Sequence, residues 1–239
     1  MVSAASASRK SDLGVRTASA AAMVAVAGGA LWLGGWWWLV FVAGVAVGVY
    51  REWRGLVRGF VPSPARRGLW NAGGLIYLGV AAATLASLRG DAQGTDVLLA
   101  LVLAVIATDV GAYFAGRAIG GPKIAPRISP SKTWAGLGGG VIGATLSVFL
   151  FALAVSGFRG SPADWLRIVP QCLLAGGLCA VVAQAGDFFE SWMKRRAGVK
   201  DSGRLLPGHG GLFDRVDGLL AVSFLMGVLI AVVRAMEPM

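Results

Sequence analysis

Seven apolar segments, each near the length that a helix needs to cross a lipid bilayer, determine what this chain can fold into. Hydrophobic residues make up 56% of the 239 residues and charged residues only 14%, which excludes a disordered chain and a soluble basic domain that binds nucleic acid. The pattern predicts an all-α, polytopic transmembrane helical bundle with about seven spans, at residues 17–33, 36–51, 69–88, 95–116, 134–157, 166–189 and 216–235.

The distribution of cations predicts the orientation of these spans. With the N-terminus in the cytoplasm, 18 of the 22 Lys and Arg side chains fall on the cytoplasmic side. An excess of cations on that side is typical of membrane proteins. We therefore expect residues 1–16 to be a cytoplasmic N-terminal segment and residues 17–239 to form a single integral-membrane domain.

Two sequence features imitate cofactor sites but favour helix packing. Cys172 and Cys179 lie in one apolar helix, roughly 10.5 Å apart along its axis, which is too far for a disulfide. Gly138, Gly140 and Gly143 match the dinucleotide-binding pattern G-x-G-x-x-G, but no strand is predicted before them. Within an apolar span, such glycines allow a neighbouring helix to approach closely.

Acidic side chains gather at the predicted cytoplasmic ends of the spans, where the cost of an ionisable group suggests a function. Asp187 and Glu190 are three residues apart and share a helix face, and so do Asp214 and Asp217. Carboxylates that face each other among Lys and Arg side chains suit Mg²⁺ together with phosphates. A network of ion pairs at the membrane surface is the alternative interpretation.

The loop between the last two spans combines cations with glycines. Gly208, Gly210 and Gly211 leave backbone N–H groups open to an anion just before a helix N-terminus. His209 is the only histidine in the chain. Phosphate contact, loop architecture and proton transfer all remain open as its role.

A second polar segment joins the fourth and fifth spans. Asp109, Tyr113 and Arg117 recur every four residues and therefore share one stripe of a helix. Two prolines exclude a helix through the loop that follows. Beside Lys132 this loop carries three hydroxyl side chains, those of Ser129, Ser131 and Thr133. They suit phosphate binding or a helix cap, and from the residues alone we favour the cap.

The segment 191–217 resembles the signature of the phosphatidate cytidylyltransferases, also called CDP-diacylglycerol synthases. That pattern reads S-x-apolar-K-R-x4-K-D-x-G-x2-L-P-x-H-G-G-apolar-x-D-R-apolar-D, and every specified position is filled here. The segment from Asp109 to Gly136 is similar to the family patterns D-x-G-A-Y-F-x-G-R and S-P-x-K-T-x-E-G. It departs from them at Ala135, where glutamate is common in the family.

The resemblance implies transfer of a cytidylyl group from CTP to phosphatidate, which gives CDP-diacylglycerol and pyrophosphate, with Mg²⁺ as cofactor. Residues 17–239 would then be one catalytic domain whose signature region is 109–217. The implied catalytic residues are Asp187, Asp214, Lys200 and Asp217, of which Asp187 and Asp214 would hold the metal. The implied substrate-binding residues are Ser129, Lys132, Thr133, Lys194, Arg195, His209 and Arg215. Asp109 would support the metal site or pair with Arg117.

The expected partners are CTP, phosphatidate and the lipid bilayer, with no nucleic acid, and with a homodimer as an assembly to be tested. The expected location is a bacterial inner membrane, with the active site facing the cytoplasm. Two other functions stay open. A transporter could use intramembrane acids to bind cations, although no internal repeat is evident, and a related head-group enzyme could use another nucleotide or an isoprenoid lipid.

Overall fold

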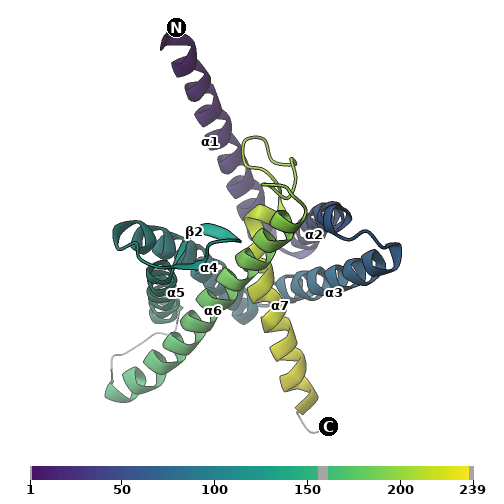
Figure 1. The fold of residues 1–239 in the computed structure, drawn as a ribbon. Coiled ribbons are helices and arrows are strands. Elements are labelled where there is room, and N and C mark those ends of the chain that lie inside the picture. Colours follow the sequence, from purple (N-terminus) through teal and green to yellow (C-terminus); the bar gives the residue numbers. More distant parts are fainter. Residues whose placement is uncertain (1, 156–160, 237–239) are drawn as a thin grey trace. The chain divides into compact units, whose positions relative to one another are not determined.

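The computed structural model of the protein describes residues 2–155 and 161–236, which form seven α-helices and one β-hairpin (Figure 1). The helices are α1 (Val2–Leu33), α2 (Gly35–Phe60), α3 (Pro64–Leu88), α4 (Ala92–Ala118), α5 (Trp134–Val155), α6 (Pro162–Arg196) and α7 (Phe213–Met236). The strands are β1 (Lys123–Ala125) and β2 (Ser129–Thr133). Each of the seven predicted apolar segments is thus a helix over its described residues, which confirms the predicted fold class.

Six of these helices are long and apolar enough to cross a membrane, namely all except α2. In α2 the apolar part ends at Tyr50, and Arg51, Glu52 and Arg54 follow directly. Six such helices make this chain an integral membrane protein. The cytoplasmic placement of the N-terminus stays a prediction.

The hairpin is the one described regular element that the sequence did not predict. The strands β1 and β2 are antiparallel, with Lys123 opposite Thr133 and Ala125 opposite Ser129. The two prolines of this loop exclude a helix, as predicted, but their positions do not by themselves specify paired strands.

The chain divides into two compact units. The first unit comprises Met1–Gly79 and Met193–Val216, and the second comprises Val80–Trp192 and Asp217–Met239. The expectation of a single catalytic domain stays a prediction.

Trp53 of α2 forms the centre of the first unit. Its side chain is 3% exposed, and its ring lies 6.4 Å from the ring of Trp70, 6.2 Å from that of Tyr77 and 6.0 Å from that of Phe213. The indole N–H donates to the backbone carbonyl of Trp70 at 3.1 Å. Aromatic clusters with a satisfied polar group bury a large apolar area at defined geometry, so Trp53 fixes α3 and the start of α7 against α2.

Close packing between α4 and α5 organises the second unit. A Cβ atom added at Gly143 would lie 2.5 Å from the carbonyl oxygen of Ala107, and one added at Gly136 would lie 3.1 Å from that of Ala112. The glycines therefore let the two helix backbones touch. Within the G-x-G-x-x-G pattern this confirms packing for Gly140 and Gly143, whereas nothing lies within 4 Å of a Cβ added at Gly138. Cys172 and Cys179 are free and buried, as expected of packing residues.

Substitution at neighbouring glycines of α5 tests this packing. In Gly139→Ala the new Cβ would meet the side chain of Ala115 and lie 2.6 Å from the carbonyl oxygen of Gly111. We expect a loss of about 1–3 kcal/mol in the free energy of unfolding, measured by unfolding of the purified protein in detergent. Gly138→Ala is the matched control, because nothing lies within 4 Å of its Cβ position. Equal stability of the two variants would contradict the packing.

Candidate functional site

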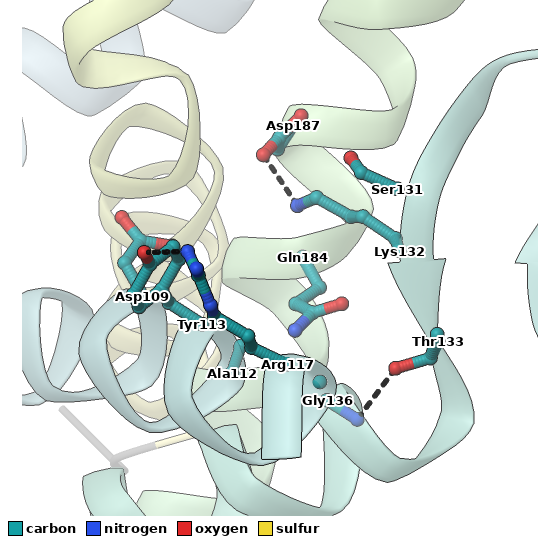
Figure 2. Close-up of a pocket in the computed structure, with 11 residues that line it drawn as sticks. Asp109, Ala112, Tyr113, Arg117, Ser131, Lys132, Thr133, Gly136, Gln184 and Asp187 are labelled. Atoms are coloured by element: carbon teal, nitrogen blue, oxygen red, sulfur yellow. Dashed lines mark hydrogen bonds and ion pairs between the residues drawn. The ribbon is translucent and has the colours of Figure 1, made fainter. Parts of the chain in front are cut away.

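A polar cavity of about 420 Å³ lies in the second unit, between α4, the hairpin and α6 (Figure 2). Its lining residues come mostly from the polar segment that joins the fourth and fifth spans; they are Asp109, Ala112, Tyr113, Gly116, Arg117, Ser131, Lys132, Thr133, Gly136, Gln184 and Asp187. Gln184 was missed from the sequence, because one amide in a long apolar run gives no pattern. Its side chain is buried and lines this cavity.

An ion pair between Lys132 of β2 and Asp187 of α6 crosses the cavity (Figure 2). The two side chains are 19% and 31% exposed, so both are reachable from the cavity. The Ser191 hydroxyl donates to Asp187 at 3.3 Å, and the Lys132 ammonium lies 5.3 Å from the centre of the Phe188 ring. Two side chains that the resemblance assigns to substrate and metal are therefore in direct contact.

Two further carboxylates interact with this pair within the second unit. Asp109 and Asp217 are each close enough to Lys132 and to Asp187 for an electrostatic interaction. Asp217 also accepts a hydrogen bond of 2.8 Å from the backbone N–H of Gly218. Three carboxylates thus surround one ammonium group, and such a cluster favours additional positive charge.

The predicted helix stripe of α4 faces this cavity. Asp109, Tyr113 and Arg117 all line it, as their spacing of four residues predicts. The guanidinium of Arg117 donates to the Tyr113 hydroxyl at 3.0 Å. The alternative pairing of Arg117 with Asp109 stays a prediction.

Thr133 acts as the cap of α5. Its hydroxyl oxygen accepts a hydrogen bond of 3.0 Å from the backbone N–H of Gly136, as N-cap side chains do. This confirms the cap that the residues favoured, and the buried Thr133 also lines the cavity. Ser129, at the start of β2, is not among the described residues that line it. Phosphate binding by either hydroxyl stays a prediction.

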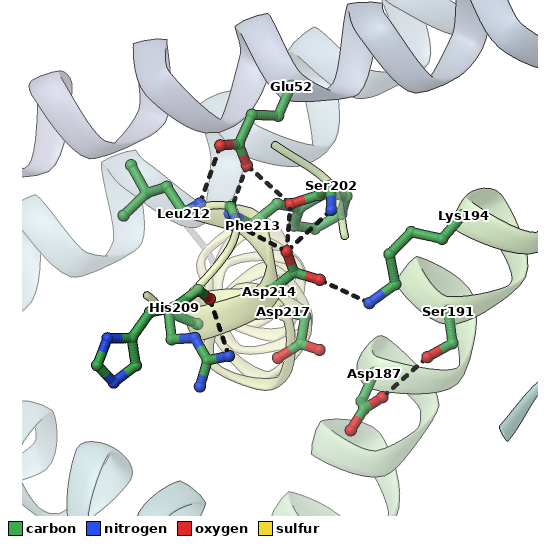
Figure 3. A network of polar contacts seen from close by, with 12 residues as sticks. Glu52, Asp187, Ser191, Lys194, Ser202, His209, Leu212, Phe213, Asp214 and Asp217 are labelled. Carbon is green, nitrogen blue, oxygen red and sulfur yellow. Dashed lines mark hydrogen bonds and ion pairs between the residues drawn. The ribbon is translucent and has the colours of Figure 1, made fainter. Parts of the chain in front are cut away.

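Asp214, in the first turn of α7, is the centre of a hydrogen-bond network in the first unit (Figure 3). Its Oδ2 accepts from the backbone N–H of Ser202 at 2.9 Å, from the Ser202 hydroxyl at 2.8 Å and from the backbone N–H of Gly211 at 2.9 Å. Its Oδ1 pairs with the Lys194 ammonium at 2.6 Å. We call residues 202–211 the glycine-rich loop. Asp214 therefore holds both ends of this loop, and it also binds Lys194, a predicted substrate-binding residue.

Glu52 of α2 holds the same loop from another helix. Its carboxylate is 7% exposed and accepts from the Ser202 hydroxyl at 2.9 Å, from Leu212 N–H at 2.9 Å and from Phe213 N–H at 2.8 Å (Figure 3). The first N–H groups of a helix have no partner inside it, and a negative charge there is favourable. Glu52 thus caps α7, a role that the sequence did not predict.

A second cavity, of about 710 Å³, lies in the first unit beside this network. We call it the basic basin, and it is lined by Arg16, Lys200, Asp201, Gly203, Arg204, Leu206, Pro207, Gly208, His209, Gly210 and Arg215. The Nδ1 of His209 lies 2.7 Å from the hydroxyl oxygen of Ser19 in α1, and the carbonyl of His209 accepts from Arg215 at 3.1 Å. Of the three roles left open for His209, these two contacts support a role in holding the structure of the loop.

The predicted site residues fall into two groups. Asp187, Asp217, Ser129, Lys132 and Thr133 belong to the second unit, whereas the first unit holds Lys194, Arg195, Lys200, His209, Asp214 and Arg215. Arg195 is exposed near the end of α6. Since Asp187 and Asp214 belong to different units, their pairing as metal ligands stays a prediction. Within the described residues, no group of three or more His, Cys, Asp or Glu side chains is arranged to hold a metal ion.

The fold is that of an integral membrane protein with two cavities lined in part by charged side chains. Comparison with known proteins gives the family: residues 67–233 match the model of the cytidylyltransferase family. The chain therefore belongs to the cytidylyltransferase family.

Curated bacterial relatives agree with this assignment. The chain is 46% identical over 186 residues to the phosphatidate cytidylyltransferase of Brucella suis, a match that covers 77% of this chain and 62% of the relative. It is 30% identical over 197 residues to the phosphatidate cytidylyltransferase of Rickettsia bellii, covering 81% of this chain and 79% of the relative. This chain thus matches only about three fifths of the length of the Brucella protein.

Replacement of Glu52 tests the cap on α7. In Glu52→Gln one acceptor oxygen becomes an N–H₂ group that faces buried N–H donors. We expect the free energy of unfolding to fall by about 1–3 kcal/mol, measured by chemical unfolding in detergent. The control is Arg54→Gln, an exposed position of the same helix, which should change stability by less than about 0.5 kcal/mol. A Glu52→Gln variant as stable as this control would contradict the cap.

Proposed function

We propose that this protein transfers a cytidylyl group from CTP to phosphatidate, giving CDP-diacylglycerol and pyrophosphate. The observation that carries this proposal is the 46% identity, over 77% of the chain, to a protein named phosphatidate cytidylyltransferase. The signature between Ser191 and Asp217, in which every specified position is filled, agrees with it.

The reaction needs no nucleophile from the protein. A phosphate oxygen of phosphatidate attacks the α-phosphorus of CTP, a new P–O bond forms there, and the bond from that phosphorus to the β-phosphate oxygen breaks, so that pyrophosphate leaves. Both reactants are anions, and catalysis consists mainly of positioning them and stabilising charge. Lys132 at the second unit's cavity and Lys194 and Arg215 in the first unit supply cations for this purpose.

The carboxylates of the second unit supply negative charge beside Lys132 but, within the described residues, are not grouped as a set of metal ligands. Asp109, Asp187 and Asp217 interact electrostatically with one another, and their oxygens are the donors that Mg²⁺ prefers. The family signature, rather than this cluster, is the basis on which we propose that Asp187 and Asp214 hold Mg²⁺. When bound, this ion would neutralise phosphate charge as the leaving group departs.

We further propose that the reaction takes place at the cytoplasmic face of a bacterial inner membrane. The placement of 18 of the 22 cations on one predicted side supports this orientation. A homodimer stays a prediction that mass photometry of the purified protein in detergent would test.

A direct assay tests the activity and the role of Asp187. Purified protein in mixed micelles should convert labelled CTP and phosphatidate to CDP-diacylglycerol, and Asp187→Asn should lower kcat by about 100-fold or more, because it removes a charge at the reacting phosphates. Asp96→Asn, at the other end of α4 from the cavity, is the control with the same chemical change. Near-normal turnover in Asp187→Asn would exclude the proposed metal ligand.

Removal of divalent cations tests the cofactor, and a substrate panel tests the specificity. Turnover should stop with EDTA and return with added Mg²⁺, because the triphosphate charge is otherwise not neutralised. Other nucleoside triphosphates and isoprenoid phosphates should be poor substrates. Faster turnover of one of these would assign a different head-group reaction, and ion flux into proteoliposomes without any nucleotide chemistry would favour a transporter.

A further inference from the structure

The two cavities differ in the charge that they present. The basic basin of the first unit is lined by four cationic side chains and one carboxylate; the cations are Arg16, Lys200, Arg204 and Arg215, and the carboxylate is Asp201. The cavity of the second unit is lined by two cations and two carboxylates, and its lysine is already paired with Asp187. A polyanion is therefore favoured in the basic basin, and cations or a single phosphate are favoured in the other cavity.

Two tight glycine turns form part of the wall of the basic basin. Gly208 and Gly210 have φ angles of +74° and +82°, a backbone conformation that residues with a Cβ atom rarely adopt. The N–H groups that follow them, those of His209 and Gly211, donate to the Leu206 carbonyl and to Asp214, so cationic side chains rather than these two amides are available to an anion. At about 710 Å³, the basin has room for a nucleotide-sized ligand.

The helix α1 forms part of this basin. Arg16 lines it, and a Cβ added at Gly208 would lie 3.0 Å from the Cγ of Arg16. Ser19, one turn further along α1, contacts His209 at 2.7 Å. Both α1 residues precede the segment 67–233 that matches the family, so neither the family match nor the signature assigns them a role.

We propose that the basic basin binds the polyphosphate chain of the nucleotide and that Arg16 of α1 is one of its ligands. The identity of the nucleotide rests on the proposed function, whereas the class of ligand, a polyphosphate, rests on the charge of the basin. Lys200, Arg204 and Arg215 bind the same chain of phosphates, and Ser19 is a positioning residue that orients His209 and, through it, the loop. After the reaction the same basin holds pyrophosphate until it leaves.

Calorimetric titration of the full-length protein with inorganic tripolyphosphate at constant ionic strength tests the class of ligand. Arg16→Gln should raise the Kd about fivefold, because one charged contact is lost at a partly exposed site. Arg16→Lys should recover part of this affinity. Arg54→Gln removes the same charge from an exposed position outside the basin and should leave the Kd unchanged. An unchanged Kd in Arg16→Gln, or equal changes in Arg16→Gln and Arg54→Gln, would overturn the proposal.

Steady-state kinetics tests the basin proposal separately from the proposed function. Arg16→Gln should raise the KM for CTP about fivefold and leave the KM for phosphatidate unchanged; the reverse would assign the basin to the lipid phosphate and overturn the proposal. If the wild-type protein binds tripolyphosphate through Arg16 but does not turn over CTP, the basin stands and the proposed function fails. If it turns over CTP while Arg16→Gln behaves like wild type, the proposed function stands and the basin proposal fails.

Discussion

The first unit depends on one buried carboxylate. Glu52 reaches from α2 to the first backbone amides of α7 and to Ser202, and these contacts close the glycine-rich loop at both ends. A buried charge without donors would be strongly unfavourable, so the loop and the helix start must adopt this arrangement for Glu52 to be buried at all. The position of Asp214, its pair with Lys194 and the wall of the basic basin all follow from that requirement.

In the second unit the corresponding constraint is the contact between two backbones. Gly116 and Gly136 let α4 and the start of α5 meet, with the Thr133 hydroxyl between them. That contact brings the hairpin beside the α4 stripe, where Lys132 meets the carboxylates. Apolar packing and charge are thus linked, because glycines that look purely structural place Asp109 of α4 and Lys132 of the hairpin on the same cavity.

The sequence predicted what depends on local pattern. Apolar length predicted the seven helices, and the side-chain chemistry of Thr133 predicted its cap. It missed what depends on distant partners: Glu52 bonds residues 150 to 161 positions away, and Ser19 meets His209 across 190 positions. No periodicity encodes such contacts. The hairpin was missed for a related reason, since its strands are too short to show alternation.

In the network around Ser202, backbone N–H groups donate more of the hydrogen bonds to Glu52 and Asp214 than the Ser202 hydroxyl does. The single hydroxyl hydrogen of Ser202 can serve Glu52 or Asp214 but not both at once. Each carboxylate nevertheless keeps two backbone donors, Leu212 and Phe213 for Glu52, and Ser202 and Gly211 for Asp214. Any residue except proline supplies a backbone N–H, so as far as these bonds are concerned the donor positions tolerate exchange. The two acids do not, and at Gly211 an added Cβ would lie against the Ser202 hydroxyl and 2.6 Å from the Oε2 of Glu52. The anchoring of the loop is therefore vulnerable to mutation at its two acceptors and at this glycine.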